Sequence, residues 1–386
     1  MKQVLILDGD AAHAVAMMEC LRISGYGPSV LCHEKNSYGY HSRLSISKFL
    51  GPDSHDTANY IDYLTNLLAE HKFDVLIPTS DVTAEILSKY KTELQRYSAI
   101  LMPDVNIFFK AYDKNKLMAL CREKGYPHPI SVDLSVIEKN KDLLVNFPYP
   151  ALIKPNLTSG ARGMTLVNSY DEFLTAYPAI HKDFGDCHLQ QYIHSGGRQV
   201  KIQIFTNQNS ETVYSSAIWK QRYYPVKGGS SCCNITISEP KYCEICSLIL
   251  KDIQWIGFAD FDLIENPQTG ELLIMEINPR TPACIRSVYK SGLDFATMIA
   301  DASLGRPIRN YTYEPGKRLR HLGFDILWFL KSKDRFKTNP SWFKFIAKDT
   351  YYQDWIKGNF ASFFYGTVGN LKKILNPEFR KAKSGI

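Results

Sequence analysis

Long hydrophobic runs are missing from this sequence. Its apolar stretches, such as Ile326 to Leu330, are far shorter than the roughly 20 residues that an α-helix needs to cross a bilayer. Near the N-terminus, Asp8 and Asp10 interrupt the short apolar run that follows Lys2, which argues against a signal peptide. We therefore expect a cytoplasmic protein without a membrane span.

Cysteine is present, but the nine cysteines form no paired framework, and such usage is typical of reduced thiols in a cytoplasm. Cys243 and Cys246 have the spacing of a redox or metal-binding pair. They fall in a stretch, 240–253, whose pattern predicts a helix. A redox or metal pair stays open for them, and ordinary helical thiols are the interpretation that we favour.

Several familiar functional signatures are also absent. The first apolar strand ends in Asp8-Gly9-Asp10, which lacks the glycine-rich dinucleotide fingerprint and whose acids would repel a pyrophosphate. No Ser/His/Asp or Cys/His set stands out, and no biotinyl or glutaminase module is visible. These absences argue against NAD chemistry and against complete carboxylases or carbamoyl-phosphate synthases.

Charge is spread unevenly. From Lys331 onward there are 12 Lys and Arg against 4 Asp and Glu, a balance of +8, whereas the preceding 330 residues hold 34 against 35, a balance of −1. Aromatic residues interleave with these lysines. Such a tail is either a helical cap that packs its aromatics on the core, which we favour, or a surface for nucleic acid or an anionic membrane.

At 386 residues and 45% hydrophobic, the chain can bury a sizeable core and should hold two or three domains. In the N-terminal part we expect strands at 4–8, 29–33 and 75–78, and helices at 11–24 and 60–70. This alternation is typical of a parallel sheet with helices on its faces.

The stretch 257–280, GFADFDLIENPQTGELLIMEINPR, predicts a β-hairpin. Asp260 and Asp262 share one face of the first strand, and the return strand presents Glu276 and Asn278 on one side. Carboxylate and amide oxygens suit Mg²⁺ or Mn²⁺, so Asp262, Glu276 and Asn278 are candidate metal ligands. A solvated surface hairpin is the alternative, which the apolar neighbours of Glu276 disfavour.

Positive groups accompany this hairpin. Arg280 follows it at once, with a planar fork suited to phosphate or carboxylate. Lys154 lies within an apolar strand at 149–155, where a lysine is costly unless it meets an anion. The loop after it, Ser159-Gly160-Ala161-Arg162-Gly163, has backbone N–H groups that could close over phosphates. We expect a phosphate site here.

In order and spacing, five stretches resemble the ATP-grasp superfamily: Asp113-Lys114 at the opening of a helix expected over 111–124, IKP at 153–155, SGARGM at 159–164, LQQYI at 189–193 and ADFDLIE…MEINPR at 259–280. The core likeness covers residues 104–308. Segment 41–43 and the tail at 328–377 look most like the carboxylate–amine ligases that include D-aspartate ligase, a group related to the carbamoyl-phosphate synthase large subunit.

The resemblance implies an α/β (α+β ATP-grasp) fold. Its parts would be an N-terminal parallel α/β pre-ATP-grasp domain at 1–103, a small lobe at 104–188, a large lobe with the metal hairpin at 189–308, and a basic, aromatic C-terminal helical extension at 309–386.

The resemblance also implies a role for each matching residue. Catalytic roles fall to Arg280, Lys154 and Arg162. ATP would be held by Lys114, Lys154, Ser159, Gly160 and Gly163 at the phosphates, by the hinge Gln190, Gln191, Tyr192 and Ile193 at adenine, and by Gln199 near ribose. Mg²⁺, or Mn²⁺ in its place, would be held by Asp262, Glu276 and Asn278. The hinge glutamines and Gln199 depart from the family, in which acids often stand at these positions.

We therefore expect an ATP-dependent ligase that activates a carboxylate as an acyl-phosphate and joins it to an amine, as an amino-acid ligase would. The loops at 160–163 and 222–229 would exclude water from the intermediate. One alternative is carboxyphosphate chemistry of the carbamoyl-phosphate synthase or carboxylase type. A second alternative is an ATP-binding protein whose basic tail binds membrane or nucleic acid.

The expected partners are small carboxylate and amine substrates, with no nucleic acid, and a homodimer is the usual state of such ligases. The tail would keep the enzyme near an anionic acceptor, linked to a lipid or a nucleotide, at the inner membrane surface.

Overall fold

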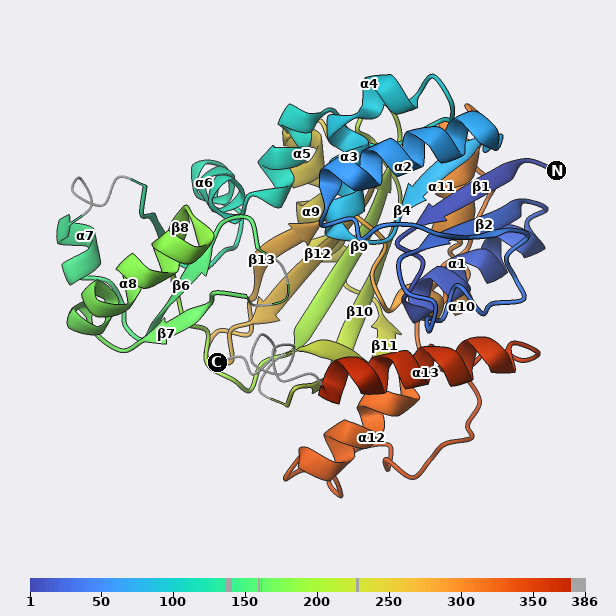
Figure 1. Cartoon of the computed structure of the whole chain (residues 1–386). Coiled ribbons are helices and arrows are strands. Elements are labelled where there is room, and N and C mark those ends of the chain that lie inside the picture. The colour runs from blue at the N-terminus through green and yellow to red at the C-terminus, as the bar shows by residue number, and fades with distance from the viewer. Residues whose placement is uncertain (136–140, 159, 161, 227–228, 376–386) are drawn as a thin grey trace.

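The computed structural model describes residues 1–135, 141–158, 160, 162–226 and 229–375, and three sheets organise this part of the chain (Figure 1). The mixture of one parallel and two largely antiparallel sheets with flanking helices is the α/β architecture that the sequence predicted. None of the helices in these ranges is long and apolar enough to cross a membrane.

The first sheet is parallel, with strand order β3-β2-β1-β4. Its inner strand β1 is apolar and fully buried from Val4 to Leu7, as a parallel strand between helices must be. The strands are β1 (Gln3–Leu7), β2 (Gly27–Cys32), β3 (Lys48–Leu50) and β4 (Val75–Pro78). The helices are α1 (Ala12–Ile23), α2 (Thr57–Glu70), α3 (Asp81–Lys89) and α4 (Lys91–Leu94). The expected strands and helices all form.

Two helices, α5 (Val105–Tyr112) and α6 (Lys114–Lys124), replace the single helix expected over 111–124. The chain breaks at Asp113, whose side chain accepts the backbone N–H of Asn115 and of Lys116 and so caps α6. Gly125 ends α6 in a left-handed conformation. The predicted opening at Asp113-Lys114 is correct, whereas Ala111 belongs to the preceding helix.

A small antiparallel sheet follows, with strand order β5-β8-β6-β7. Its strands are β5 (Ser131–Asp133), β6 (Ala151–Pro155), β7 (Thr165–Val167) and β8 (Cys187–Gln191), and its helices are α7 (Lys141–Val145) and α8 (Tyr170–Phe184). One face packs its own apolar cluster under α8, around Phe173 and Leu189. The opposite face carries the side chains of the candidate site.

The largest sheet has strand order β13-β12-β9-β10-β11-β14-β15. Its strands are β9 (Gln199–Thr206), β10 (Thr212–Tyr224), β11 (Ser230–Ile237), β12 (Gly257–Glu265), β13 (Leu272–Asn278), β14 (Arg318–Arg320) and β15 (Thr350–Tyr352). The helices of this region are α9 (Pro240–Asp252), α10 (Ile285–Lys290) and α11 (Phe295–Ser303). Residues 222–224, expected in a loop, extend β10 because they pair with β11. Lys227 and Gly228 of that expected loop lie outside the described residues.

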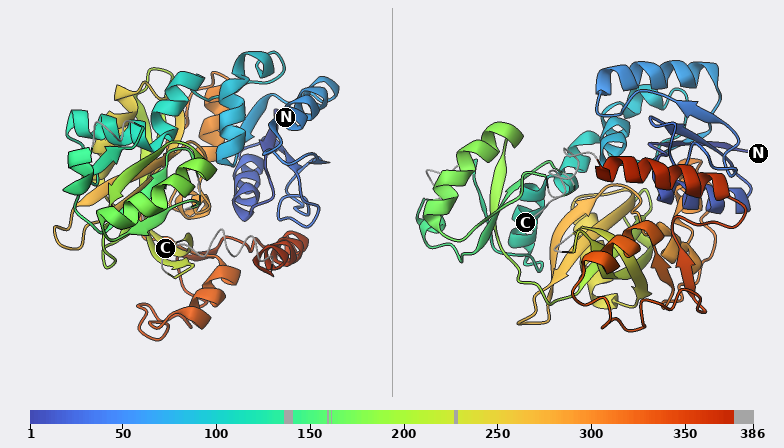
Figure 2. Two further views of the ribbon diagram at one scale, coloured as in Figure 1. Left: turned by 60° about the vertical axis from the view of Figure 1, so that its left-hand side comes forward. Right: turned by 60° about the horizontal axis from the view of Figure 1, so that its bottom comes forward.

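The C-terminal extension adds β14 and β15 to this sheet and supplies α12 (Leu322–Lys331) and α13 (Phe360–Leu375). Asp325 of α12 is fully buried and accepts hydrogen bonds from Arg222 and Arg320. The two guanidinium groups lie against Trp328 and Trp342. This charged cluster fastens α12 to the sheet, and α12 and α13 lie on the same side of the molecule (Figure 2).

Candidate functional site

The β12–β13 hairpin forms where the sequence predicted it. In its register Asp262 lies opposite Glu276, and Asp260 lies opposite Asn278. The Asn278 amide Nδ2 donates to Asp262 Oδ2 at 3.0 Å, which brings the three predicted metal ligands onto one face of the two strands. Within the described residues no group of three or more His, Cys, Asp or Glu is placed to hold a metal, so the candidate set is two carboxylates and one amide.

Two lysines that were not predicted as site residues form ion pairs with Asp262. Lys201 on β9 lies 2.8 Å from Asp262 Oδ2, and Lys220 on β10 lies 2.5 Å from Asp262 Oδ1. Burial raises the pKa of the Asp262 carboxyl, but these two ammonium groups more than offset burial and lower its pKa well below the ordinary value. Asp262 is therefore an ionised carboxylate.

Asp260 is the fully buried neighbour of this carboxylate. Its Oδ2 accepts from Lys201 at 2.5 Å, and its Oδ1 has no hydrogen-bond partner within the described part of the chain. Burial raises the pKa of Asp260, and the nearby charge of Asp262 adds to the rise. Burial lowers the pKa of Lys201, but the same two acids more than offset burial and raise it above its usual range. Lys201 thus serves as the counter-charge of an acid pair in which Asp260 is fully buried and Asp262 partly buried.

The donor set fits a magnesium ion that takes most of its ligands from phosphate. Glu276 has a side chain that is 34% exposed, with Oε2 3.6 Å from Lys114 Nζ. The amide oxygen of Asn278 lies 3.4 Å from Arg280 Nη2. All the donors are oxygens on paired strands, which is the chemistry that Mg²⁺ prefers, and too few protein donors are present to enclose a bare ion.

Arg280 connects this hairpin to the N-terminal domain. Its Nε lies 3.0 Å from Asp81 Oδ1, at the start of α3. Burial lowers the pKa of Arg280, but the charges of Asp81, Asp260 and Asp262 more than offset burial and raise the pKa above its ordinary value. The guanidinium therefore stays charged. Ser80 caps α3, and the contact of Asp81 with Arg280 was not predicted. The carboxyl edge of the parallel sheet therefore borders the hairpin.

Lys114 and Lys154 approach from the other side. The Lys114 ammonium donates to the carbonyl oxygen of Thr158, and Lys154 Nζ donates to Gln190 Oε1 at 2.8 Å. Both lysines are buried. Burial lowers the pKa of Lys154 to about 8; the charge of Glu276 raises it and that of Lys114 lowers it. An anion that binds beside such a lysine stabilises its charged form.

His188, directly opposite Lys154 in the β6–β8 pair, is a further buried polar residue of this face. Its Nδ1 lies 2.8 Å from Asn156 Oδ1, and its Nε2 is buried with no hydrogen-bond partner among the described residues. Burial lowers its pKa well below the ordinary value, and Lys154 and Lys114 add to the effect. The imidazole is therefore neutral, with Nδ1–H donating to Asn156.

The loop after β6 is described in part, and Ser159 lies outside the described residues. Gly160 and Gly163 adopt left-handed backbone conformations with φ of +67° and +74°. A Cβ atom at Gly163 would come within 2.7 Å of the Phe184 ring, so glycine is required there. Arg162 is exposed, and its carbonyl oxygen accepts from the Thr158 hydroxyl at 3.0 Å.

At the hinge, two backbone N–H groups are already used within the protein: Gln191 N–H donates to Ile130 O and Tyr192 N–H donates to Pro150 O. Within the described residues, the Ile193 N–H has no acceptor and can meet a ligand. Gln199 begins β9 and pairs with Lys220 and Ile264 in the sheet. Its side chain is half-buried and makes no described hydrogen bond to the other candidate residues.

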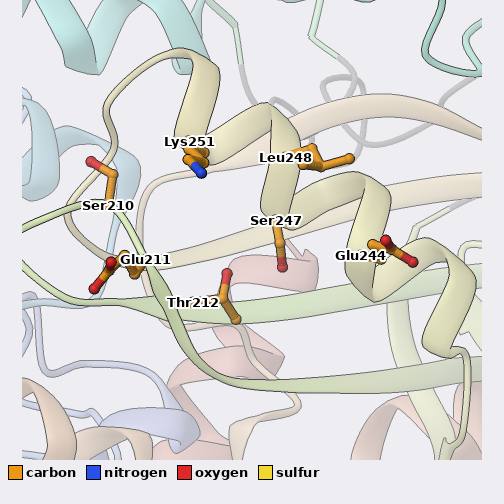
Figure 3. A pocket seen from close by; sticks show the side chains of 7 residues that line it. All are labelled: Ser210, Glu211, Thr212, Glu244, Ser247, Leu248 and Lys251. Carbon is orange, nitrogen blue, oxygen red and sulfur yellow. The ribbon is translucent and has the colours of Figure 1, made fainter.

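A separate surface pocket of about 230 Å³ lies between α9 and the turn that precedes β10 (Figure 3). Ser210, Glu244 and Lys251 are among the residues that line it, and it includes none of the candidate residues. Cys243 and Cys246 lie on α9, as predicted, and no disulfide forms among the nine cysteines, all of which are described.

Residues 113–310, just over half of the chain, match the family described as the carbamoyl-phosphate synthase L chain, ATP binding domain. The chain belongs to this family. It is an ATP-grasp protein, as the order of its motifs implied, and the matched region contains the paired lysines, the hinge and the whole hairpin.

Named relatives share the same superfamily. The chain is 22% identical over 285 residues to D-aspartate ligase of Enterococcus faecium, covering 66% of each protein. It is 23% identical over 233 residues to the C-terminal section of the carbamoyl phosphate synthase large chain of Methanopyrus kandleri, covering 58% of this chain and 42% of the relative. It thus spans less than two thirds of these relatives.

Solved ATP-grasp structures show the same fold. The biotin carboxylase domain of Hydrogenobacter thermophilus 2-oxoglutarate carboxylase superposes with a TM-score of 0.69 at 16% identity, covering 82% of this chain and 73% of that one. An N5-carboxyaminoimidazole ribonucleotide synthetase in complex with ADP gives a TM-score of 0.64 at 15% identity, covering 87% and 86%. At these identities the likeness establishes the ATP-grasp fold.

Proposed function

We propose that this ATP-grasp protein is a carboxylate–amine ligase that forms an acyl-phosphate from ATP. The observation that carries the proposal is the convergence of Lys114 with Glu276, 3.6 Å apart, which brings the lysine face of the small lobe to the metal-ligand face of the hairpin. Arg280 stands beside Asn278 on the same hairpin. A polyphosphate between these faces would meet cations on one side and oxygen ligands for a metal on the other.

ATP would enter with its adenine at the hinge and its phosphates between the lobes. The Ile193 N–H, which has no acceptor among the described residues, supports adenine binding there, and the Gln199 side chain is proposed for the ribose. Lys114, Lys154 and the loop with Gly160 and Gly163 are proposed for the phosphates. Ser159 of the same loop is also proposed to bind the phosphates.

Asp262, Glu276 and Asn278 would hold Mg²⁺, or Mn²⁺ in its place. When bound, such an ion neutralises charge on the phosphate oxygens. The Mg-ADP named with the Hydrogenobacter structure supports this assignment.

In the first step, an oxygen of the substrate carboxylate attacks the γ-phosphorus of ATP. The bond to the bridging oxygen breaks, ADP leaves, and the carboxyl becomes an acyl-phosphate. Arg280 is placed to steady the transferred group, and Lys154 and Arg162 are proposed to add positive charge. This step requires placement and charge rather than a protein nucleophile.

In the second step, an amine nitrogen attacks the acyl carbon and the phosphate leaves with the electron pair of the C–O bond. The nitrogen then loses a proton, which yields an amide. Water must be excluded between the steps because it would hydrolyse the acyl-phosphate. D-aspartate ligase as a relative supports an amino acid as the carboxylate.

Carboxyphosphate chemistry is the second candidate. It is supported by the carbamoyl phosphate synthase relatives and by the bicarbonate named with the Hydrogenobacter structure. In that case bicarbonate would replace the organic carboxylate in the same first step.

The setting of the enzyme is also proposed. We propose a cytoplasmic homodimer, in line with the dimer named for the Hydrogenobacter domain. Its amine acceptor would be small or carried by a lipid or a nucleotide at the inner membrane surface; the basic composition of the extension supports this placement.

A hydroxylamine trap tests the proposal. The protein, Mg-ATP and a panel of D- and L-amino acids, dicarboxylates and bicarbonate are incubated with hydroxylamine, and hydroxamate and ADP are measured. Hydroxamate from one carboxylate would support acyl-phosphate chemistry and name the donor. If ADP is released without hydroxamate and bicarbonate stimulates that release, the result would favour carboxyphosphate chemistry instead.

A further inference from the structure

Helix α13 packs against the N-terminal domain through its smallest side chains. Ser362 donates to the carbonyl oxygen of Tyr38 at 2.6 Å. A Cβ atom at Gly366 would lie 2.4 Å from the Tyr38 ring, and one at Gly369 would lie 2.1 Å from the carbonyl oxygen of Asn36. Positions 362, 366 and 369 share one helix face. This face is therefore the docked one, and at its edge the Tyr365 ring stacks on His41 with the ring centroids 3.8 Å apart.

The opposite face of α13 is apolar and open to solvent. Phe360, Phe364 and Leu371 recur at helical spacing and are 63%, 51% and 52% exposed. A helix on a protein surface normally turns its large apolar residues inward and its small or polar residues outward. Here the arrangement is reversed, which leaves an apolar stripe exposed, with only the partly exposed Trp355 ring packed edge-on against Phe360 among the described residues.

A second group of exposed apolar residues lies in the same extension. Leu330, at the end of α12, is 63% exposed, and Phe336, Phe343 and Ile346 in the segment after it are 71%, 58% and 96% exposed. Both groups belong to the C-terminal extension, whose helices α12 and α13 lie on the same side of the molecule (Figure 2). Large exposed apolar surface of this kind marks an interaction site.

The charge around these residues has one sign. The stretch from 355 to 375 contains three lysines and no Asp or Glu. In the segment after α12 the one exposed acid is Asp334, which pairs with Lys337 at 3.2 Å, while Lys331, Lys333 and Lys344 are exposed. A second copy of this chain would bring two positive surfaces together. An anionic partner matches the surface better.

We propose that this side of the molecule, defined by the exposed face of α13 and the segment from Leu330 to Ile346, binds the surface of an anionic phospholipid membrane. The aromatic and aliphatic side chains would enter the interfacial layer, while the lysines meet lipid phosphates. The helix lies flat on the protein and would lie flat in the interface.

Vesicle flotation with the full-length chain tests the proposal. Vesicles of phosphatidylcholine alone are compared with vesicles that also contain phosphatidylglycerol. We expect binding to the anionic vesicles only, and weaker binding as salt is raised. The double variant Phe364→Ser/Leu371→Ser should reduce the bound fraction at least tenfold. These side chains are exposed, so the fold should persist, and unchanged binding of ATP in solution verifies this.

Leu174→Ser is the matched control, because Leu174 on α8 is 47% exposed but lies in the small lobe. It should leave vesicle binding unchanged. Lys372→Glu should weaken binding, whereas Lys182→Glu on α8 should not. Absence of binding to both kinds of vesicle, or equal binding by the wild type and the double variant, would overturn the proposal. Self-association that the double variant abolishes, without vesicle binding, would assign the surface to a second copy instead.

Discussion

Lys154 Nζ donates to Gln190 Oε1 at 2.8 Å across the β6–β8 pair, and both side chains are buried. An amide oxygen orients the ammonium group without neutralising it. The charge of Lys154 is thus only partly compensated, and its pKa stays near 8. We infer that the missing compensation comes from the nucleotide phosphates.

Nucleotide binding should therefore weaken with rising pH. Below pH 8 Lys154 already carries its proton, whereas above pH 8 it must take one up to meet the phosphates. Affinity for Mg-ATP should fall above pH 8, by up to about tenfold per pH unit. Calorimetry between pH 7 and 9.5 measures this, and binding near pH 8 to 9 should be accompanied by proton uptake.

The matched variants for this test are Gln190→Glu and Gln191→Glu. A carboxylate at 190 would lie next to Lys154, raise its pKa and shift the fall in affinity to higher pH. Gln191 faces Ile130 instead, so its replacement should leave the pH profile in place. A flat wild-type profile to pH 9.5 would argue against Lys154 as a phosphate ligand.

Loss of one hairpin carboxylate should abolish turnover without unfolding the protein. Glu276→Gln keeps the shape of a partly exposed side chain but removes the charge that would hold the metal. We expect a fall in ATP turnover of at least about a hundredfold, roughly 3 kcal/mol, at unchanged thermal stability. Glu271→Gln, in the exposed turn of the same hairpin, serves as the control. Near-normal turnover in Glu276→Gln would exclude this residue from the site.

The buried cluster that fastens α12 should be essential for stability. Asp325→Asn would leave Arg222 and Arg320 buried without a countercharge, and breaking such a buried pair costs about 3–5 kcal/mol. Urea unfolding should show this loss. The exposed Asp334→Asn should change the free energy of unfolding by less than about 0.5 kcal/mol. Equal effects of the two substitutions would contradict the structural role of Asp325.

The close approach of α13 to Tyr38 makes a second prediction on stability. Gly366→Ala should release α13 from its docked position, because the added methyl group overlaps the Tyr38 ring. Gly323→Ala on α12 meets nothing closer than 3.8 Å and should be neutral or slightly stabilising. Limited proteolysis should cleave near α13 faster in Gly366→Ala only. Identical cleavage of both variants would refute the docking.

The sequence predicted the fold class and the hairpin because both rest on local periodicity. Alternation placed Asp262 on one face, and an apolar strand marked Lys154 as a lysine in need of an anion. The same argument applies to Lys201, which stands between Val200 and Ile202 and is buried beside Asp260. Lys220 was less visible because its strand is more polar.

Contacts between distant segments escaped prediction. The ion pair of Arg280 with Asp81 depends on how the parallel sheet meets the large sheet, which no local pattern encodes. Which face of α13 packs against the rest of the protein was also not predictable. Its aromatic stripe favours inward packing, but the structure docks the glycine face because only that face lets the backbone approach Tyr38. The aromatics of α12 do pack inward, as Trp328 shows.

The central claim, transfer of the γ-phosphoryl group to a carboxylate, is tested most directly by following a heavy-oxygen label. Once the hydroxylamine trap has named the donor, its carboxyl group is labelled with heavy oxygen and incubated with Mg-ATP and the amine. The account predicts one labelled oxygen in the released phosphate, and none from Glu276→Gln. Label in AMP, or ATP cleavage that yields only unlabelled phosphate, would contradict it.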